Sequence, residues 1–286
     1  MKVSGFTFVR NGVILGYPFL ESILSVLPIC DEFIVNVGAS EDDTLERVRS
    51  IGSEKIRVIE SLWNPEMRVK GYAYGQQKMI AQFNCTGDWA FYLEADEVVH
   101  EADLPAIEAA MEKHLSDNRV EALIFDYLHF YGNANTYAWS PGWYRTAPRI
   151  IRNSIRTFCP DALFWVVMKK NKTARYPRAA HTGATIYHYG WVRSESQMNL
   201  KSQQVLQYWN KPHRKIDYSE IDPFILREFR GNHPKVLESW LSPSDGLFQA
   251  IPGHRLEIRE RKHRLMLKLE KWFGLELSKK HHTLVR

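Results

Sequence analysis

The chain has 286 residues, of which 44% are hydrophobic and 25% charged, the composition of a globular protein with a large buried core. This composition excludes a disordered or fibrous protein. The longest stretch without a charged residue, Tyr127 to Tyr144, contains glycine, asparagine and proline, so we expect no membrane-spanning helix. The apolar run before Arg10 is too short for a secretory signal, and we therefore expect a cytoplasmic protein.

The net charge of +5 is unevenly distributed along the chain. Residues 254–286 contain ten Lys and Arg and four Glu, a local charge of +6. The remaining 28 basic and 29 acidic residues in 1–253 therefore sum to −1. Because the body of the chain carries no excess of positive charge, we expect no nucleic acid partner.

The cysteine count argues against a disulfide framework. Cys30, Cys85 and Cys159 are odd in number and widely spaced, which also disfavours a zinc site. We expect three buried thiols.

The first half of the chain alternates short apolar runs with helical patterns, which is typical of βα units in a mostly parallel sheet. Strands are predicted at Val3 to Val9, Phe33 to Val37, Ile56 to Ile59, Trp89 to Leu93 and Glu121 to Tyr127. Helices are predicted at Pro18 to Pro28, after Asp43, at Tyr72 to Phe83 and at Leu104 to Leu115. Asp43 and Glu46, three residues apart, predict a capping box for the second helix.

Three acids, Glu94, Asp96 and Glu97, directly follow the apolar strand Trp89 to Leu93. Open α/β sheets bind their ligands at the carboxyl ends of the strands. Two carboxylates that are two residues apart can both turn toward one Mg²⁺ or Mn²⁺ ion. The pattern therefore predicts a divalent cation site, and solvated turn acids are the alternative.

At these residues the sequence resembles the nucleotide-sugar-binding half of the GT-A glycosyltransferases, specifically the inverting family 2. FTFVRNG is similar to the first-strand element of that family, and DEFIVNVGASEDDT to its second strand and acidic loop. GYAYGQQKMIAQFNCTGDWAFYLEADE is similar to its glycine-led helix, its Gly-Asp turn, its apolar strand and its Asp-x-Asp metal motif. The ordered set covers roughly the first 130 residues and is far more specific than any one motif.

The resemblance implies a GT-A fold, an α/β Rossmann-like mixed sheet flanked by helices, with a helical C-terminal extension. It implies a catalytic domain in 1–210, divided into a nucleotide-sugar-binding half (1–130) and an acceptor half (131–210), and an extension in 211–286. The implied donor-binding residues are Val9, Arg10, Asn36, Lys78, Glu94 and Ala95, and the implied metal ligands are Asp96 and Glu94.

Two of these positions depart from the family pattern. Many relatives have paired aspartates after the second strand, one of which contacts uracil, whereas this chain has Asn36 and Val37, so the donor base stays open. The metal motif begins with Glu94 in place of Asp, which favours Asp96 as the main protein ligand. Lys78 would add positive charge near the donor phosphates, and a solvated lysine on an amphipathic helix is an equally good interpretation.

In the second half, IYHYGWVRSESQMNLKSQQVLQYW resembles the His-Tyr segment of bacterial family 2 transferases that act on lipopolysaccharide core and other surface glycans. The resemblance implies that His188 completes the coordination shell of Mn²⁺ or Mg²⁺. Imidazole is an acceptable ligand for Mn²⁺ beside carboxylate and phosphate. A hydrogen-bonded packing histidine is the alternative.

An inverting transfer needs a carboxylate that takes the proton from the acceptor hydroxyl. The plausible acids are Asp161, Asp126 and Glu97. We favour Asp161, with Glu97 as the second choice, because Asp161 lies in an aromatic setting after a predicted core strand at Arg149 to Ile151; a turn acid beside Pro160 is the alternative.

Two further segments have open roles. The aromatic loop Tyr127 to Tyr144, with Trp139 and Trp143, would stack on a sugar or anchor itself by packing. Arg255 to Leu277 predicts a basic amphipathic helix that docks on its own domain, on an anionic membrane or on a second subunit.

The resemblance thus implies a glycosyltransferase that moves a sugar from a nucleotide diphosphate donor to a glycan or glycolipid acceptor, with inversion and with a divalent metal. The expected location is the cytoplasm, with peripheral contact at the inner face of the membrane. One alternative is a sugar-phosphate nucleotidyltransferase of the same fold, whose glycine-rich basic signature FVRNGVILGY does not supply. Another is a non-catalytic binding protein that uses the basic C-terminal helix.

Overall fold

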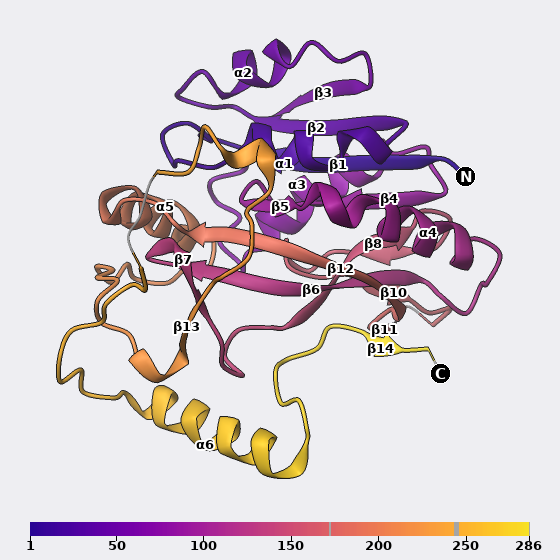
Figure 1. The fold of residues 1–286 in the computed structure, drawn as a ribbon. Helices are drawn as coiled ribbons and strands as arrows, with labels where there is room; N and C mark the ends of the chain where they lie inside the picture. The colour runs from indigo at the N-terminus through magenta and orange to yellow at the C-terminus, as the bar shows by residue number, and fades with distance from the viewer. Residues whose placement is uncertain (172, 243–245, 286) are drawn as a thin grey trace.

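The computed structural model describes residues 1–171, 173–242 and 246–285, so residues 172, 243–245 and 286 of the sequence lie outside the described part. Its centre is a mixed sheet of eleven described strands flanked by helices (Figure 1). The α/β architecture predicted from the sequence is confirmed.

The strands of the central sheet fall into a parallel and a mostly antiparallel half. The parallel half, in spatial order, consists of β3 (Ile56–Ser61), β2 (Glu32–Gly38), β1 (Val3–Val9) and β4 (Trp89–Tyr92). The other half contains β8 (Thr146–Arg152), β6 (Ala122–Tyr131), β7 (Asn133–Ala138), β13 (Leu226–Glu228), β12 (Arg178–Trp191), β5 (Glu97–Val99) and β14 (Thr283–Leu284). A separate small sheet contains β9 (Thr157–Phe158), β10 (Val166–Met168) and β11 (Ala174–Arg175).

The first half contains the four predicted helices, of which the first three join consecutive strands of the parallel half. They are α1 (Phe19–Val26), α2 (Thr44–Ser50), α3 (Tyr72–Gln82) and α4 (Leu104–His114). The second half adds α5 (Glu195–Gln207) and α6 (Ile258–Phe273), with short 3₁₀ turns at Leu27–Ile29, Glu101–Asp103, Pro223–Ile225 and Lys235–Leu237. None of the described helices is both long and apolar enough to cross a membrane.

The central strands are apolar on both faces because helices and loops cover both sides of the sheet. All four residues of β4 are buried, and six of the seven residues of β1 are buried. Parallel pairing places Phe6 opposite both Ile34 and Tyr92, so β1, β2 and β4 end at the same edge of the sheet. The three cysteines are buried and free, as predicted.

The long strand β12 brings distant residues together beside β4. It pairs with β5 in antiparallel register and with β6 in parallel register, which places His188 directly between Glu97 and His129. Cross-strand partners point to the same face of a sheet, so these three side chains lie side by side.

The predicted aromatic loop is largely a β-hairpin. Strand β6 continues to Tyr131, the chain turns at Gly132 with a positive φ of 73°, and β7 runs back from Asn133 to Ala138. Burial alternates along β7, the period of a half-buried strand, and the sequence analysis did not weigh that alternation. The loop prediction was wrong for residues 128–131 and 133–138, which are strands.

The predicted capping box of α2 is also wrong. Asp43 occupies the N-cap, but its carboxylate pairs with the Arg47 side chain at 2.8 Å. The neighbouring Asp42 instead accepts a hydrogen bond from the backbone N–H of Thr44 at 3.1 Å. The first turn of the helix is therefore capped from one residue earlier than the spacing suggested.

The C-terminal extension is not helical throughout. It contributes β13, which pairs with β7, and β14, which pairs with β12. Helix α6 lies outside the sheet (Figure 1) and ends at Gly274, whose φ is 63°. It is anchored by ion pairs, from Glu270 to Arg145 at 2.7 Å and from Arg264 to Asp222 at 2.5 Å.

Candidate active site

A pocket of about 280 Å³ lies at the carboxyl ends of β1 and β4. It is lined by the end of β1, the turn after β4, the segment 161–163 and one face of α5. Of the residues predicted from the sequence, the pocket is lined by Val9, Arg10, Glu94, Ala95, Asp96 and Asp161. Ligands of open α/β sheets are expected at this edge.

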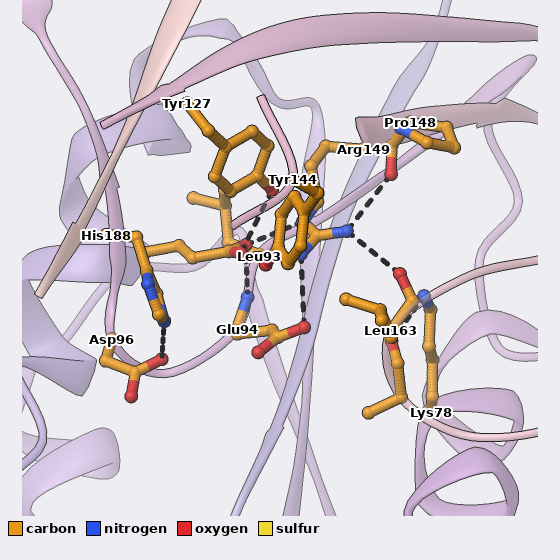
Figure 2. Close-up of polar contacts among 12 residues, drawn as sticks. Lys78, Leu93, Glu94, Asp96, Tyr127, Tyr144, Pro148, Arg149, Leu163 and His188 are labelled. Carbon is orange, nitrogen blue, oxygen red and sulfur yellow. Dashed lines mark hydrogen bonds and ion pairs between the residues drawn. The ribbon is translucent and has the colours of Figure 1, made fainter. Parts of the chain in front are cut away.

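The predicted metal ligands form a cluster beside this pocket. One ligand atom each of Glu94, Asp96 and His188 lies within 4.8 Å of the other two. The Nε2 atom of His188 lies 3.6 Å from Oδ1 of Asp96, as Figure 2 shows. Two carboxylates and an imidazole are ligands that suit Mn²⁺ or Mg²⁺ together with water and phosphate, so the donor set fits the predicted ion.

The backbone around the cluster holds His188 against Asp96. The backbone N–H of Tyr189 donates to the carbonyl of Asp96 at 2.8 Å, which ties β12 to the turn after β4. Gly190 has no side chain, and a Cβ there would lie 2.5 Å from the His188 ring and 3.3 Å from Oδ2 of Asp96. A residue larger than glycine would therefore displace the imidazole.

A second histidine determines which nitrogen of His188 faces the carboxylates. The Nε2 atom of His129 lies 2.8 Å from the carbonyl oxygen of Tyr144, which only accepts, so Nε2 of His129 carries its proton. Burial, with the neighbouring His188, holds the pKa of His129 well below its usual value, so His129 is neutral and its Nδ1 accepts. Nδ1 of His188, at 2.9 Å, is then the donor. A His188 ring that is protonated on Nδ1 alone presents the lone pair of Nε2 to the cluster, and this is the form that can bind a metal ion.

Three cationic or potentially cationic groups surround Asp96. The Nζ atom of Lys201 lies 2.8 Å and the Nη2 atom of Arg193 lies 3.2 Å from its Oδ2. Burial alone would raise the pKa of Asp96, but Lys201, His188 and Arg193 outweigh it and hold that pKa well below the usual value. Asp96 is therefore ionised at neutral pH.

The other two acids share Arg149, which is fully buried. Its guanidinium binds Glu97 through two hydrogen bonds, at 2.7 and 2.6 Å. It binds Glu94 through one hydrogen bond at 3.1 Å, as Figure 2 shows. Burial and the neighbouring charge of Glu97 raise the pKa of Glu94 to about 7. The hydroxyl of Tyr127 also donates to Glu97 at 3.0 Å.

Glu97 is thus poorly suited to the catalytic base role that the sequence suggested as second choice. Its side chain is fully buried, its two oxygens are committed to Arg149, and it is not among the residues that line the pocket. The third acid that we considered, Asp126, is exposed and pairs with His181 at 3.2 Å. Asp161 alone of the three lines the pocket, where its Oδ1 accepts from the backbone N–H of Leu163 at 2.8 Å.

Lys78 and Asn36 lie behind the pocket wall. Lys78 is fully buried, donates to the carbonyl of Ala162 at 2.9 Å, and lies 3.6 Å from the centre of the Trp165 ring. Burial lowers its pKa to about 8, so the interpretation as a solvated lysine was wrong. Asn36 is also buried, and its amide donates to Gln77 at 2.9 and 3.0 Å rather than facing the pocket.

Aromatic side chains form the wall opposite the metal cluster, and the sequence analysis did not identify this wall. It consists of Phe8, Trp63, Tyr74, Tyr208 and Trp209, with neighbouring ring centres 5.0 to 5.9 Å apart. The guanidinium of Arg10 links this wall to the residue that follows β2. Its Nε donates to the carbonyl of Ala39 at 2.9 Å, and its Nη1 donates to the hydroxyl of Tyr208 at 3.3 Å.

The residues that α5 adds to the pocket also escaped the sequence analysis, although a signal was present. Ser194 and Gln197 form a capping box that starts this helix. Four of the residues that line the pocket here follow at helical spacing: Lys201, Gln204, Val205 and Tyr208. Positions that are three, four and seven residues apart share one helix face, so the sequence did indicate a common surface.

No protein-family model matches this chain, and no curated protein matches it. Similar solved structures include S. aureus TarS 1–349, which is 17% identical with a TM-score of 0.35 over 54% of this chain and 48% of that one. A second TarS structure is 15% identical, with a TM-score of 0.40 over 72% of this chain and 39% of that one.

A third similar structure is the glucosyl-3-phosphoglycerate synthase of Mycobacterium tuberculosis, solved with Mn²⁺, UDP-glucose and phosphoglyceric acid. It is 21% identical to this chain, with a TM-score of 0.33 over 44% of each chain. The match therefore spans less than half the length of each of these proteins.

Proposed function

We propose that this chain is a glycosyltransferase of the GT-A type, family 2, that moves a sugar from a nucleoside diphosphate donor to a hydroxyl of a glycan or glycolipid acceptor, with inversion. The observation that carries the proposal is the pocket at the carboxyl ends of β1 and β4, which combines the cluster Glu94, Asp96 and His188 with an aromatic wall. A nucleoside diphosphate has the matching parts, a flat base and a charged diphosphate.

In this proposal Asp96, Glu94 and His188 hold Mn²⁺ or Mg²⁺. The ion would neutralise the negative charge that builds on the diphosphate as the bond to the sugar breaks. Neighbouring residues would fix the position of the ion by orienting its ligands, since Arg149 binds Glu94 and His129 binds His188. We retain the division into a donor half, 1–130, and an acceptor half, 131–210, with His188, Tyr208 and Trp209 of the second segment completing the donor site.

The base of the donor would lie against the aromatic wall. Trp63 and Tyr74 meet edge to face at 5.0 Å, and Arg10 closes the wall from the β1 side. Aromatic rings stack on any nucleobase, so the wall supports a nucleotide donor and leaves the identity of its base open. Val9 and Ala95 contribute to the lining between this wall and the metal cluster.

Asp161 is the proposed catalytic base. Inversion needs one carboxylate near the sugar's anomeric carbon that takes the proton of the attacking hydroxyl. Asp161 lines the same pocket as Asp96, whereas Asp126 and Glu97 do not. We assign Glu97 instead to positioning, because it fixes Arg149 and through it Glu94.

The outward face of α6 is the proposed membrane contact. Ile258, Leu265 and Trp272 are seven residues apart, so they form one stripe along the helix, and they are 87%, 56% and 71% exposed. Arg261, Lys262 and Lys268 flank this stripe. An exposed apolar stripe with flanking cations suits the interface of an anionic lipid membrane, where a glycolipid acceptor would be found.

The proposed function is tested by donor turnover. The purified chain is incubated with a panel of UDP-, GDP-, ADP- and CDP-sugars in Mn²⁺, and release of the nucleoside diphosphate is followed with and without membrane lipid extract as acceptor. We expect release from donors of one base only. If no donor turns over with any acceptor, the proposed function is wrong.

A further inference from the structure

We propose that Lys201 is a cation shared between two partners. It neutralises Asp96 when the site is empty, and it pairs with the diphosphate of the donor once a divalent cation binds Asp96. The inference rests on the proposed function for its second half, whereas its first half concerns the metal alone.

The contacts of Lys201 suit a group that changes partner. Its Nζ lies 2.8 Å from Oδ2 of Asp96 and 3.4 Å from the carbonyl of Gly190. Its side chain is 17% exposed and lines the pocket. A lysine carries its charge on a flexible four-carbon stem, so the ammonium can leave Asp96 while the helix stays in place.

Arg193, the other cation on Asp96, does not have this freedom. Its side chain is 1% exposed, and Nη1 donates to the carbonyl of Leu15 at 2.6 Å while Nη2 donates to Asp96 at 3.2 Å. The guanidinium also packs 4.6 Å from the ring of Tyr17. Arg193 is therefore the fixed counter-ion of Asp96, and Lys201 is the movable one.

The charges of the site balance without a metal. The carboxylates of Glu94, Glu97 and Asp96 pair with the three cations Arg149, Arg193 and Lys201, which gives a sum of zero when all are ionised. A bound divalent cation leaves two positive charges in excess, and a diphosphate supplies the negative charge that matches them. Metal and diphosphate are therefore expected to strengthen each other's binding.

The position of Lys201 on α5 places it between the two parts of the donor site. Tyr208, one residue after the end of α5, belongs to the aromatic wall, and Lys201, seven residues earlier on the same face, contacts Asp96. A nucleotide with its base on the wall and its diphosphate at Asp96 would lie along this face. Lys201 would then reach the diphosphate by a change of side-chain rotamer.

The experiment compares Lys201→Met with the wild type and with Lys113→Met, an exposed lysine on α4 that undergoes the same loss of charge. Mn²⁺ binding is titrated alone, and binding of UDP, GDP, ADP and CDP is titrated in saturating Mn²⁺. For Lys201→Met we expect affinity for Mn²⁺ alone to rise about tenfold and affinity for the preferred nucleoside diphosphate to fall about tenfold. Lys113→Met is expected to match the wild type in both.

The expected changes in Mn²⁺ affinity and in nucleotide affinity have opposite signs, which a purely structural role of Lys201 would not produce. A Lys201→Met variant that binds Mn²⁺ more weakly, or that leaves either affinity unchanged, overturns the proposal. Lys201→Arg keeps the charge and is expected to keep Mn²⁺ affinity near the wild type, and Lys201→Gln replaces Lys201→Met if the latter fails to fold. If the wild type binds no nucleoside diphosphate, the proposed function fails, and so does the inference that Lys201 pairs with the diphosphate. The Mn²⁺ titration still decides whether Lys201 neutralises Asp96 in the absence of metal.

Discussion

The Nδ1 atoms of His129 and His188 lie 2.9 Å apart, and this hydrogen bond holds the His188 ring with its Nε2 3.6 Å from Oδ1 of Asp96. His129→Phe keeps a flat ring but removes the acceptor, so His188 loses its preferred tautomer. We expect Mn²⁺ affinity to fall about 10- to 100-fold, the usual effect of losing such a partner of a metal ligand.

Isothermal titration of Mn²⁺ checks this prediction, with His181→Phe as the control. His181 lies on the same strand, β12, but is half-exposed and pairs with Asp126 away from the pocket. If His129→Phe and His181→Phe bind Mn²⁺ equally well, His129 does not act through His188.

Neutralising Asp161 is expected to affect turnover, whereas neutralising Glu97 is expected to affect stability. Asp161→Asn should abolish turnover while leaving the free energy of unfolding and metal-dependent nucleotide binding near the wild type, because its side chain lines the pocket. Glu97→Gln leaves the buried guanidinium of Arg149 with Glu94 as its one described carboxylate partner and should lower the free energy of unfolding by about 3 kcal/mol. Urea denaturation and a turnover assay of both variants check the pair. Full turnover in Asp161→Asn would assign the base elsewhere.

Lys78 should make stability depend on pH in the alkaline range. Its pKa is lowered from 10.5 to about 8 by burial, so between these values the unfolded chain binds more protons than the folded one. The free energy of unfolding therefore rises with pH across this window, by roughly 3 kcal/mol from this group. Lys78→Met removes this pH-dependent contribution. The variant's free energy of unfolding should therefore exceed that of the wild type by more at pH 7 than at pH 10. Urea denaturation at both pH values checks this, and an equal difference at the two would contradict it.

The apolar stripe of α6 should bind anionic vesicles. We expect the chain to sediment with vesicles of phosphatidylcholine and phosphatidylglycerol but not with phosphatidylcholine alone, and to be released by high salt. The double variant Leu265→Ser and Trp272→Ser should lose this binding. Phe83→Ser, which alters an exposed apolar residue outside α6, should keep it. Binding that survives the double variant, or a concentration-dependent dimer that the double variant abolishes, would argue against the membrane contact.

The sequence predicted the parallel half of the fold and the acidic cluster well, for a physical reason. Strands such as β4 are buried on both faces and therefore appear as continuous apolar runs, and Glu94 and Asp96 follow β4 directly. The relation of His188 to Asp96 was predicted only through resemblance. In the structure it follows from the register of β12 against β5.

Other parts of the site had no local signal. Arg149 lies 52 residues from Glu97 and reaches it because β8 pairs with β4 in antiparallel register, a tertiary relation that no short pattern encodes. The sequence placed Lys78 either near the donor phosphates or on a solvated helix face, because charged residues are rarely buried, but its ammonium packs against the rings of Tyr92 and Trp165.

The most direct test of the account is whether nucleotide binding needs the metal at Asp96. Isothermal titration of UDP, GDP, ADP and CDP is performed in Mn²⁺ and in EDTA, with wild type and with Asp96→Asn whose fold is verified by circular dichroism. The account predicts that wild type binds one of these nucleotides in Mn²⁺ and not in EDTA, and that Asp96→Asn loses the binding in Mn²⁺. Equal binding in Mn²⁺ and EDTA, no binding in either, or undiminished binding by Asp96→Asn would contradict it.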